Sequence, residues 1–406
     1  MSFTPRKYQT RIAADAVAIL KAHKIVYLAL EVRTGKTFTA LMAAHHYGAV
    51  RVLFLTVKKA IKGIENDIET FGKLDVDVLS IDSAHKAAGD YDLIIIDEAH
   101  GIGAFPKPSK RAKSIKEVAD GLPIILLSGT PHPESLSQCF HQFWVSSFSP
   151  FKEYGNFYKW SKDYVDVRKM KFNGFEANDY SRGIQTKFDP IIAQYFLTFS
   201  QEEADFNCEV KEHILTVDMN LSTVDAINRL KKDKVLVGAE HTVLADTPVK
   251  LLSKVHQMSS GTVIAESGDY IIFDRSKALY IADKFKGKKI AIYYKFQSEY
   301  DMIKEIYGDN LTTDVEEFQT GDKNIALQIK AGSMGIGLSA ADCQVFLNLD
   351  FSSKDYIQSR ARLQTQKRES VDVYFIFGKG GIEFDIYKAL QKKQDYTSRY
   401  FKKLYF

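Results

Sequence analysis

The sequence predicts an α/β fold in which one chain of 406 residues carries two parallel-sheet lobes. Two clusters of short apolar runs, separated by polar segments with helical character, support this prediction, because strands covered on both faces are apolar throughout. The length fits two or three domains. Between the clusters this rhythm is lost. We therefore predict lobes at residues 1–148 and 263–406, with an inserted or bridging, mainly helical region at 149–262.

The first cluster of apolar runs lies in the N-terminal lobe. Its runs are short and rich in β-branched residues, which favours strands over buried helices. We predict strands at 26–30, 52–57, 76–81, 93–97 and 124–130. The stretch FTALMAAHHY after the first of them has helical character.

The second cluster, near the C-terminus, repeats the same pattern. We predict strands at 290–294, 325–329, 343–349 and 371–377. Ahead of them, TVIAESGDYIIF (262–273) is typical of a hairpin. Aromatic and basic side chains interleave from Phe151 to Phe188, a composition that can hold single-stranded nucleic acid. For this segment we favour a small aromatic core whose lysines face water, and for the C-terminal run TSRYFKKLYF a docked helix or strand.

Composition excludes several classes of protein. No apolar run reaches the roughly 18–20 residues of a membrane helix. The N-terminus MSFTPRKYQT lacks the apolar core of a secretion signal, so we expect no membrane association and a cytoplasmic protein of a bacterium or a phage-infected host. Cys139, Cys208 and Cys343 lie far apart and are expected to be reduced core residues. The net charge of +4 is compatible with phosphate-rich partners and does not identify one.

A phosphate loop is the strongest local signal. LEVRTGKT, from Leu30 to Thr37, lies between a predicted strand and a predicted helix, although Leu30 occupies the first glycine position of the usual GxxxxGK[ST] pattern. Gly35 would let backbone N–H groups surround phosphate oxygens, and the helix N-terminus would add positive potential. Lys36 would neutralise the β- and γ-phosphates, and the Thr37 hydroxyl would bind Mg²⁺.

A pair of acids ends the apolar run LIIIDEAH, residues 93–100. Asp97 would hold Mg²⁺, directly or through water, and Glu98 would orient and deprotonate the attacking water. Taken alone, the pair could be a solvated strand end. Together with the phosphate loop it is far more specific, and it predicts ATP and Mg²⁺ as ligands.

At this point the sequence resembles the superfamily-2 helicases, and within them the Swi/Snf-type double-stranded DNA translocases and their small phage-like relatives. The resemblance covers most of the chain and implies two RecA-like lobes. The run from Arg6 to Gln9 resembles the N-terminal glutamine motif, which implies that Gln9 reads adenine. Glu31 to Thr37 resembles motif I, with Arg33 where the family commonly has glycine. The resemblance implies nucleotide binding by Arg6, Gln9, Arg33, Thr34, Gly35, Lys36 and Thr37.

Three further motifs of the first lobe are expected to bind nucleic acid or to link the nucleotide state to nucleic-acid binding. Phe54 to Lys58 resembles motif Ia, and Asp97 to His100 is similar to motif II. The run from Ser128 to Pro131 resembles motif III, so His100, Ser128, Gly129 and Thr130 are expected to couple nucleotide state to strand binding; a structural turn is the alternative. Expected strand contacts, each of which could also be an exposed polar loop residue, are Thr56, Lys58, Lys59, Ser83 and His85.

In the second lobe, Ala331 to Leu338 resembles motif V, and Lys250 to Gly261 is similar to a helix that precedes this lobe in Swi/Snf relatives. Gly335 and Gly337 would let backbone approach phosphate, and Ser333 and Lys330 are expected strand contacts.

The strand-end aspartate and the last motif follow in the same lobe. Asp350 stands at the family's strand-end aspartate. Gln358 to Arg362 resembles motif VI, which implies catalytic roles for Gln358 and Arg362 and nucleotide binding by Arg360. The family's second arginine is Thr365 here; Arg360, Lys367 or Arg368 could replace it.

The resemblance implies a DNA helicase or double-stranded DNA translocase that couples ATP hydrolysis to movement. ATP would favour a closed arrangement of the lobes and hydrolysis would release it. We expect a monomer that acts on DNA in preference to RNA. An RNA helicase and an ATP-gated nucleic-acid clamp with weak hydrolysis remain alternatives. A small-molecule kinase is disfavoured, because it explains neither the DEAH run nor the second lobe.

Overall fold

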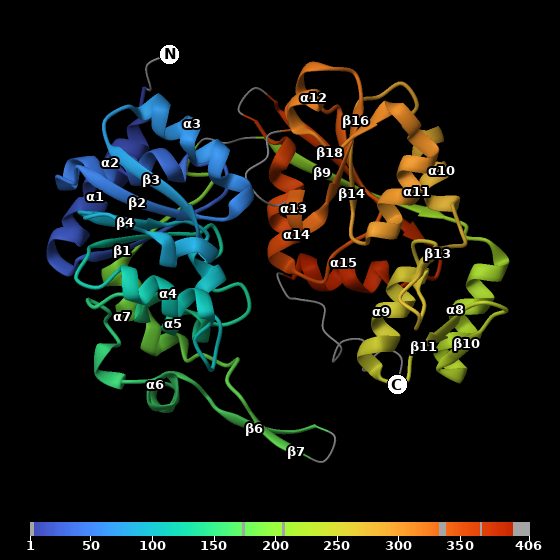
Figure 1. Cartoon of the computed structure of the whole chain (residues 1–406), viewed down its shortest axis with the longest axis horizontal. Coiled ribbons are helices and arrows are strands. Elements are labelled where there is room, and N and C mark those ends of the chain that lie inside the picture. The colour runs from blue at the N-terminus through green and yellow to red at the C-terminus, as the bar shows by residue number, and fades with distance from the viewer. Residues whose placement is uncertain (1–3, 173–174, 205–207, 333–337, 366–367, 393–406) are drawn as a thin grey trace. The chain divides into compact units, whose positions relative to one another are not determined.

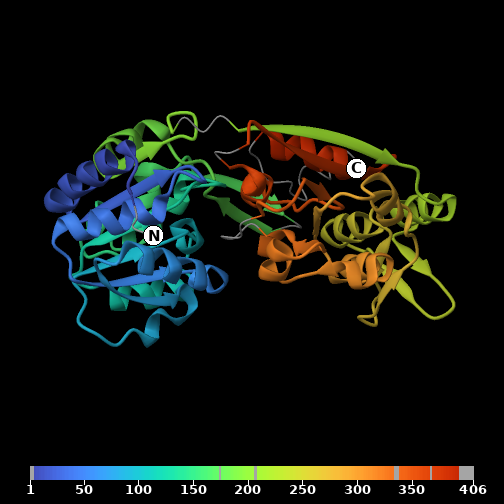
Figure 2. The same cartoon turned by 90° about the horizontal axis from the view of Figure 1, so that it is seen from above.

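The computed structural model describes residues 4–172, 175–204, 208–332, 338–365 and 368–392. The chain forms two compact units, Met1–Phe206 and Asn207–Phe406. Each unit contains one six-stranded parallel sheet flanked by helices (Figures 1 and 2). The predicted α/β fold with two parallel-sheet lobes is therefore confirmed.

The boundaries of the units differ from the predicted ones. The region 149–262 is not a separate body, because it is divided between the two units, and it contains strands as well as helices. Its strand β8 (Phe196–Phe199) pairs with β1 (Ile25–Leu30) in the first sheet. Its strand β9 (Glu209–Val217) pairs with β18 (Ser370–Gly378) in the second, where Figure 2 shows it as a long edge strand. Both are half-exposed edge strands, so their sequences lack the continuous apolar run of a central strand.

The first sheet has the strand order β3-β2-β4-β5-β1-β8, and every neighbouring pair is parallel. All five apolar runs of the first cluster form its strands. The remaining members are β2 (Arg51–Thr56), β3 (Asp75–Ser80), β4 (Leu93–Ile96) and β5 (Ile124–Leu127). Residues of β4 and β5 are buried throughout, as expected for strands covered on both faces. The helices around this sheet include α1 (Lys7–His23), α2 (Lys36–Tyr47), α3 (Ile61–Phe71) and α4 (Lys110–Val118).

The order of the strands brings three sequence motifs to one edge of the first sheet. β5 lies between β1 and β4, and all three strands run in the same direction. The phosphate loop follows β1, the run from Ser128 follows β5, and Asp97 follows β4. Because parallel strands end at a common edge, these segments are neighbours in space.

The remainder of the first unit packs around aromatic side chains. It consists of α5 (Cys139–Trp144), α6 (Phe157–Tyr164), the hairpin β6 (Arg168–Phe172) and β7 (Phe175–Asp179), and α7 (Gln185–Tyr195). Trp160 is fully buried and stacks on Tyr164, with ring centroids 5.1 Å apart. Phe151 and Phe188 are buried in the same cluster, which confirms the predicted aromatic core. The hairpin β6–β7 extends away from the rest of the unit (Figure 1).

The second sheet has the order β15-β16-β14-β17-β18-β9, again with parallel pairs. Four of its strands are the predicted apolar runs, and the predicted hairpin is also present. The strands of this unit not yet described are β14 (Ile290–Tyr294), β15 (Leu311–Thr312), β16 (Asn324–Gln328) and β17 (Cys343–Phe346), with the hairpin β12 (Thr262–Ile264) and β13 (Tyr270–Ile272). The helices are α8 (Leu221–Asp233), α9 (Pro248–Met258), α10 (Ser276–Lys284), α11 (Gln297–Tyr307), α12 (Val315–Thr320), α13 (Ile329–Gly332), α14 (Ser353–Arg360) and α15 (Glu383–Gln391).

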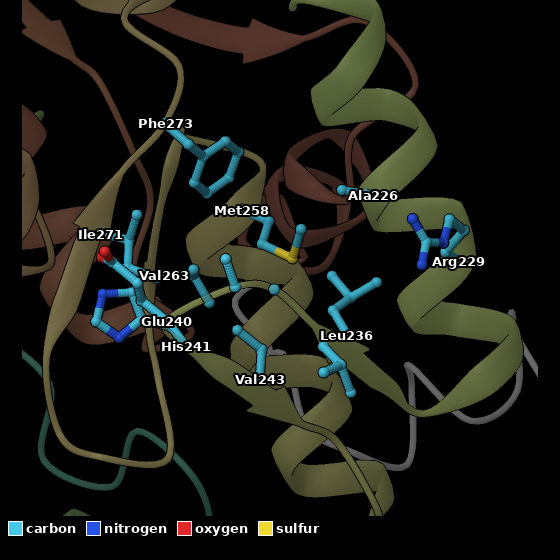
Figure 3. A pocket seen from close by; sticks show the side chains of 13 residues that line it. Ala226, Arg229, Leu236, Glu240, His241, Val243, Met258, Val263, Ile271 and Phe273 are labelled. Carbon is cyan, nitrogen blue, oxygen red and sulfur yellow. The ribbon is translucent and has the colours of Figure 1, made fainter.

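An apolar cavity of about 460 Å³ lies in the second unit among α8, α9, the hairpin β12–β13 and the hairpin β10 (Val235–Val237) and β11 (Thr242–Leu244) (Figure 3). Met258, Val263 and Phe273 are among its lining residues. Residues predicted to bind nucleotide or nucleic acid do not line it.

Two expectations from composition can be compared with the structure. Cys139, Cys208 and Cys343 are buried and unbridged, as expected for core residues. Among the described residues, none of the helices has both the length and the apolar character needed to cross a bilayer.

Candidate functional site

The phosphate loop connects β1 to α2 and ends in a glycine that the geometry requires. Gly35 precedes the first residue of α2, Lys36, and has a left-handed backbone with φ of 77°. A Cβ at Gly35 would lie 2.4 Å from Nε2 of Gln9, so a larger residue fits neither the backbone nor the space. Lys36 and Thr37 therefore occupy the first turn of α2, where backbone N–H groups and the helix dipole favour an anion.

The glutamine motif packs against this loop. Gln9 is buried; its Oε1 accepts a hydrogen bond from N of Arg6 (2.9 Å), and its Nε2 donates to the carbonyl oxygen of Gly35 (3.3 Å). The hydroxyl of Tyr8 donates to the carbonyl oxygen of Thr34 (3.1 Å). The structure thus joins the two predicted nucleotide motifs, while adenine recognition by Gln9 stays a prediction.

Arg33, at a position where the Swi/Snf-type family commonly has glycine, adopts a left-handed backbone conformation. Its φ is 67°, in the left-handed region that glycine enters readily and other residues enter at a cost of roughly 1–2 kcal/mol. The loop therefore keeps a glycine-like backbone at the position where the sequence departs from motif I.

The acid pair follows β4 and carries an unfavourable concentration of charge. Burial, and next the neighbouring Glu98 carboxylate, raise the pKa of Asp97 to about 6, while Lys36 opposes this shift. The hydroxyl of Thr56 donates to Oδ2 of Asp97 (2.9 Å). Glu98 also has a left-handed backbone, with φ of 49°. Strain and a disfavoured charge at one strand end are features of binding and catalytic sites.

A magnesium ion fits the oxygen atoms at this edge. Mg²⁺ bound with a nucleotide takes one or two protein oxygens and completes its shell with phosphate oxygens and waters. The Thr37 hydroxyl and the Asp97 carboxylate are ligands of that kind, and a cation would stabilise the ionised form of Asp97. Within the described part of the chain there is no group of three or more His, Cys, Asp or Glu residues that could hold a metal by itself.

The predicted coupling residues contact one another. Nδ1 of His100 lies 2.8 Å from Oγ of Ser128 and 3.3 Å from Oε2 of Glu98. Oγ of Ser128 also accepts a hydrogen bond from N of Thr130 (3.0 Å). A Cβ at Gly129 would lie 3.6 Å from Nζ of Lys36. The segment after β5 is therefore linked to the acid pair and lies beside the phosphate-loop lysine.

One predicted strand contact has a partner inside the unit. Thr56 is fully buried, and its hydroxyl donates to Asp97, an arrangement that favours positioning of the acid over contact with nucleic acid. The reason is its place at the end of β2, a strand that pairs with β4. Lys58 and His85 are exposed after the neighbouring strands β2 and β3, and Ser83 is half-buried against Ser80. The strand contacts of Thr56, Lys58, Lys59, Ser83 and His85 stay predictions.

In the second unit, the first arginine of the run that resembles motif VI has a partner within the unit. Arg360 forms an ion pair with Glu212 of β9, to which Tyr356 also donates a hydrogen bond (2.7 Å). A largely buried carboxylate needs such partners, so Arg360 is engaged within its own unit. Nucleotide binding by Arg360 stays a prediction. Gln358 is buried, and Arg362 is half-buried in the turn after α14. Their catalytic roles stay predictions.

Other second-unit predictions have mixed outcomes. Nη2 of Arg368 donates to the carbonyl oxygens of Ser339 and Ala341, both at 2.8 Å. It is therefore already engaged, which weakens it as a replacement for the missing arginine. Ser333, Gly335, Gly337 and Lys367 lie outside the described residues.

One element of the site, β8 and the turn that follows it, is not predicted by the sequence analysis. N of Glu31 donates to the carbonyl oxygen of Phe199 (3.0 Å), and Nε2 of Gln201 donates to the carbonyl oxygen of Val32 (2.8 Å). A pocket beside the loop is lined by Glu31, Gly129 and residues of β8. No motif marks this half-exposed segment, so only its pairing with β1 locates it.

Comparison with known proteins gives distant relatives. No family model matches the chain. Curated relatives of the chain bear the name SWI/SNF-related matrix-associated actin-dependent regulator of chromatin subfamily A-like protein 1 or are called its homolog. The Xenopus tropicalis protein is 23% identical over 355 residues, covering 78% of this chain and 35% of that protein. The Drosophila melanogaster protein is 23% identical over 325 residues, covering 76% and 41%. The Caenorhabditis elegans homolog is 23% identical over 420 residues, covering 91% and 58%.

The chain thus spans between a third and three fifths of the length of these curated relatives. They confirm the predicted resemblance to Swi/Snf-related proteins. Among solved structures, the chain is similar to the Sulfolobus solfataricus SWI2/SNF2 ATPase core in complex with dsDNA, with a TM-score of 0.43 and 15% identity over 97% of this chain and 92% of that one. The same core domain on its own gives 0.42 and 15% identity, over 97% and 89%.

Proposed function

We propose that this chain, a distant sequence relative of the SWI/SNF-related chromatin regulators, is an ATP-driven motor that moves on or remodels DNA. ATP hydrolysis would supply the energy, and contacts with the phosphate backbone would make movement independent of base sequence. The relatives' name refers to chromatin, whose DNA is double-stranded. That favours duplex DNA over RNA as the partner.

One observation carries the proposal. A lysine, an acid pair and a serine–histidine contact meet where three neighbouring parallel strands end. Lys36 would neutralise the β- and γ-phosphates, Asp97 and Thr37 would hold Mg²⁺, and Glu98 would orient the attacking water. The contact between His100 and Ser128 would report the state of this site to the segment after β5.

The partner, assembly and location of the protein belong to the same proposal. Lys58, Lys59 and His85 are exposed after neighbouring strands of the first sheet and would contact the backbone of the nucleic acid. We assign the catalytic arginine to Arg362, because Arg360 is held by Glu212. The protein would act as a monomer in the cytoplasm.

The experiment is an ATPase assay with duplex DNA, single-stranded DNA, RNA or no nucleic acid. We expect the largest stimulation by duplex DNA, and at least about a hundredfold loss of turnover in Lys36→Ala and in Glu98→Gln. Stimulation by RNA alone would replace the DNA motor with an RNA helicase. Unchanged turnover in either variant would refute the assigned roles.

A clamp that binds ATP and hydrolyses it slowly is the second candidate function. It is favoured by Thr365 at the position of the family's second arginine and by the engagement of Arg360 and Arg368 within their own unit. ATP-dependent retention on duplex DNA, with turnover that DNA does not stimulate, would select the clamp.

A further inference from the structure

The turn after β8 is hydrogen-bonded to the phosphate loop, although the two segments are far apart in the sequence. β8 pairs with β1 up to Leu30 and Phe199, and the next residue, Glu31, continues the ladder by donating its N–H to Phe199. The chain then turns at residues 201–204. We call residues 199–203 the loop brace.

Gln201 is the brace residue that holds the loop directly. Its backbone N–H donates to Oε2 of Glu31 (2.9 Å), and its side-chain Nε2 donates to the carbonyl oxygen of Val32 (2.8 Å). These two bonds hold Glu31 and Val32 of the loop. The turn is itself closed, because N and Oγ of Ser200 both donate to Oε2 of Glu203, at 2.7 and 3.0 Å.

Glu31 connects the loop brace to the residues that would bind phosphate. Its carboxylate accepts from the brace, while its carbonyl oxygen accepts from Oγ1 of Thr34 (2.7 Å) and lies 3.4 Å from Nζ of Lys36. A shift of Glu31 would therefore move the lysine and the turn of the loop together. The brace acts on Lys36 through a single intermediate residue.

The composition of the loop explains why such support is needed. A phosphate loop usually begins with glycine, but this one has Leu30 there and Arg33 in a left-handed conformation. Non-glycine residues stay in that region only where surrounding contacts impose it. The bonds from Gln201 fall on Glu31 and Val32, immediately before Arg33, so they are placed to impose it.

We propose that Gln201 is a positioning residue for ATP, and that it holds a glycine-poor phosphate loop in the shape that binds the triphosphate. The inference rests on the proposed ATP-dependent function. It adds a residue that no motif contains and that lies 170 positions from Glu31. Gln201 does not touch the reacting atoms in this assignment; it acts through Glu31, Val32 and Arg33.

The first test changes Gln201 itself. Gln201→Glu replaces the donor with a carboxylate facing the Val32 carbonyl, and Gln201→Ala removes the side-chain bond. We expect the KM for ATP to rise about tenfold and about fivefold, respectively, with kcat at saturating ATP within about twofold of the unmodified chain. Glu202→Ala, an exposed neighbour in the same turn, is the matched control and should change neither constant.

The second test asks whether the brace acts by imposing the conformation of Arg33. If it does, glycine at that position removes the need for it, so Gln201→Ala should raise the equilibrium Kd for ATP less than twofold in the Arg33→Gly background. Lys24→Gly is the control background, because Lys24 also has a positive φ (60°) but lies outside the loop. There the full effect of about fivefold should persist.

The outcomes separate this inference from the proposed function. An unmodified chain that binds ATP without nucleic-acid-stimulated turnover would end the motor proposal, while the ATP titration would still measure the brace. Unchanged ATP affinity in both Gln201 variants, with thermal unfolding showing that they are folded, would overturn the inference. So would an equal effect of Gln201→Ala in the Arg33→Gly and Lys24→Gly backgrounds.

Discussion

Two aspartates that follow strands, Asp97 and Asp350, differ in the charged groups that surround their carboxylates. Asp97 follows β4 in the first unit, where burial and Glu98 raise its pKa to about 6. Asp350 follows β17 in the second unit and is paired with Nζ of Lys295 at 3.5 Å. Lys295 in turn lies 3.7 Å from the ring centroid of Phe351. The charge of Asp350 is balanced by a lysine within the unit, whereas the disfavoured charge of Asp97 would be stabilised by a bound cation.

The same contrast separates the two arginines of motif VI. Arg360 forms an ion pair with Glu212, as Lys295 does with Asp350, and we propose Arg362, in the turn after the helix, as the arginine that reaches the nucleotide. We expect Arg362→Gln to lower kcat by about 10³-fold, because an arginine that stabilises the γ-phosphate contributes on that scale. Arg360→Gln should instead lower the unfolding temperature and should reduce kcat less than Arg362→Gln does. Steady-state kinetics and thermal unfolding of both variants would measure this; a larger kcat loss in Arg360→Gln would reverse the assignment.

Asp97→Asn should separate stability from activity. ATPase activity should fall at least about a hundredfold, since the ligand for Mg²⁺ is weakened. Without nucleotide or Mg²⁺, the variant should be more stable than the unmodified chain by about 1–3 kcal/mol at pH 7.5, because the raised pKa makes the charged carboxylate unfavourable in the folded state.

The pH dependence fixes the sign of this effect. Above about pH 6, Asp97 is ionised in both folded and unfolded states, so the full penalty applies. As pH falls from 6 towards 4, the folded state takes up the proton first, and the advantage of the variant should disappear. Urea unfolding at pH 7.5 and 4.5 would test this. Asp67→Asn is a matched control, because burial raises the pKa of Asp67 to about 6 as well, but Asp67 belongs to α3 and to none of the predicted motifs; this variant should gain stability without losing activity.

Lys295→Met should have the opposite effect on stability. It leaves Asp350 buried without its cation, and we expect a loss of about 2–4 kcal/mol in the free energy of unfolding. Adding Asp350→Leu should recover most of this loss, because replacing both partners of a buried pair is close to neutral. If the double variant were no more stable than the single one, Asp350 would have a role beyond the ion pair.

Ser128→Ala should have the smallest effect and would test the link between the acid pair and the segment after β5. The variant loses the contact with His100 and the acceptor for N of Thr130. We expect the ratio of DNA-stimulated to basal ATPase turnover to fall about fivefold. Ser137→Ala, which removes another buried hydroxyl of the first unit, should leave this ratio unchanged.

Local patterns predicted most of the sheets and the positions of the main motifs. Central strands such as β4 and β5 are predicted because they are apolar along their whole length. The motifs are recognised because they follow predicted strands: Asp97 directly follows β4, and the loop with Gly35 and Lys36 follows β1. The edge strands β8 and β9 were missed for the same physical reason, since half of each faces solvent. The boundaries of the units moved with them.

The sequence by itself determined the α/β class, the phosphate loop and the acid pair, because periodicity and short spacings are local properties of a chain. Only the tertiary structure decided that Thr56 serves Asp97, that Arg360 serves Glu212, and that Gln201 holds the loop. Each of these contacts joins residues between 41 and 169 positions apart. Which partner satisfies a polar side chain depends on which strands become neighbours, and that order is set by packing of the whole unit.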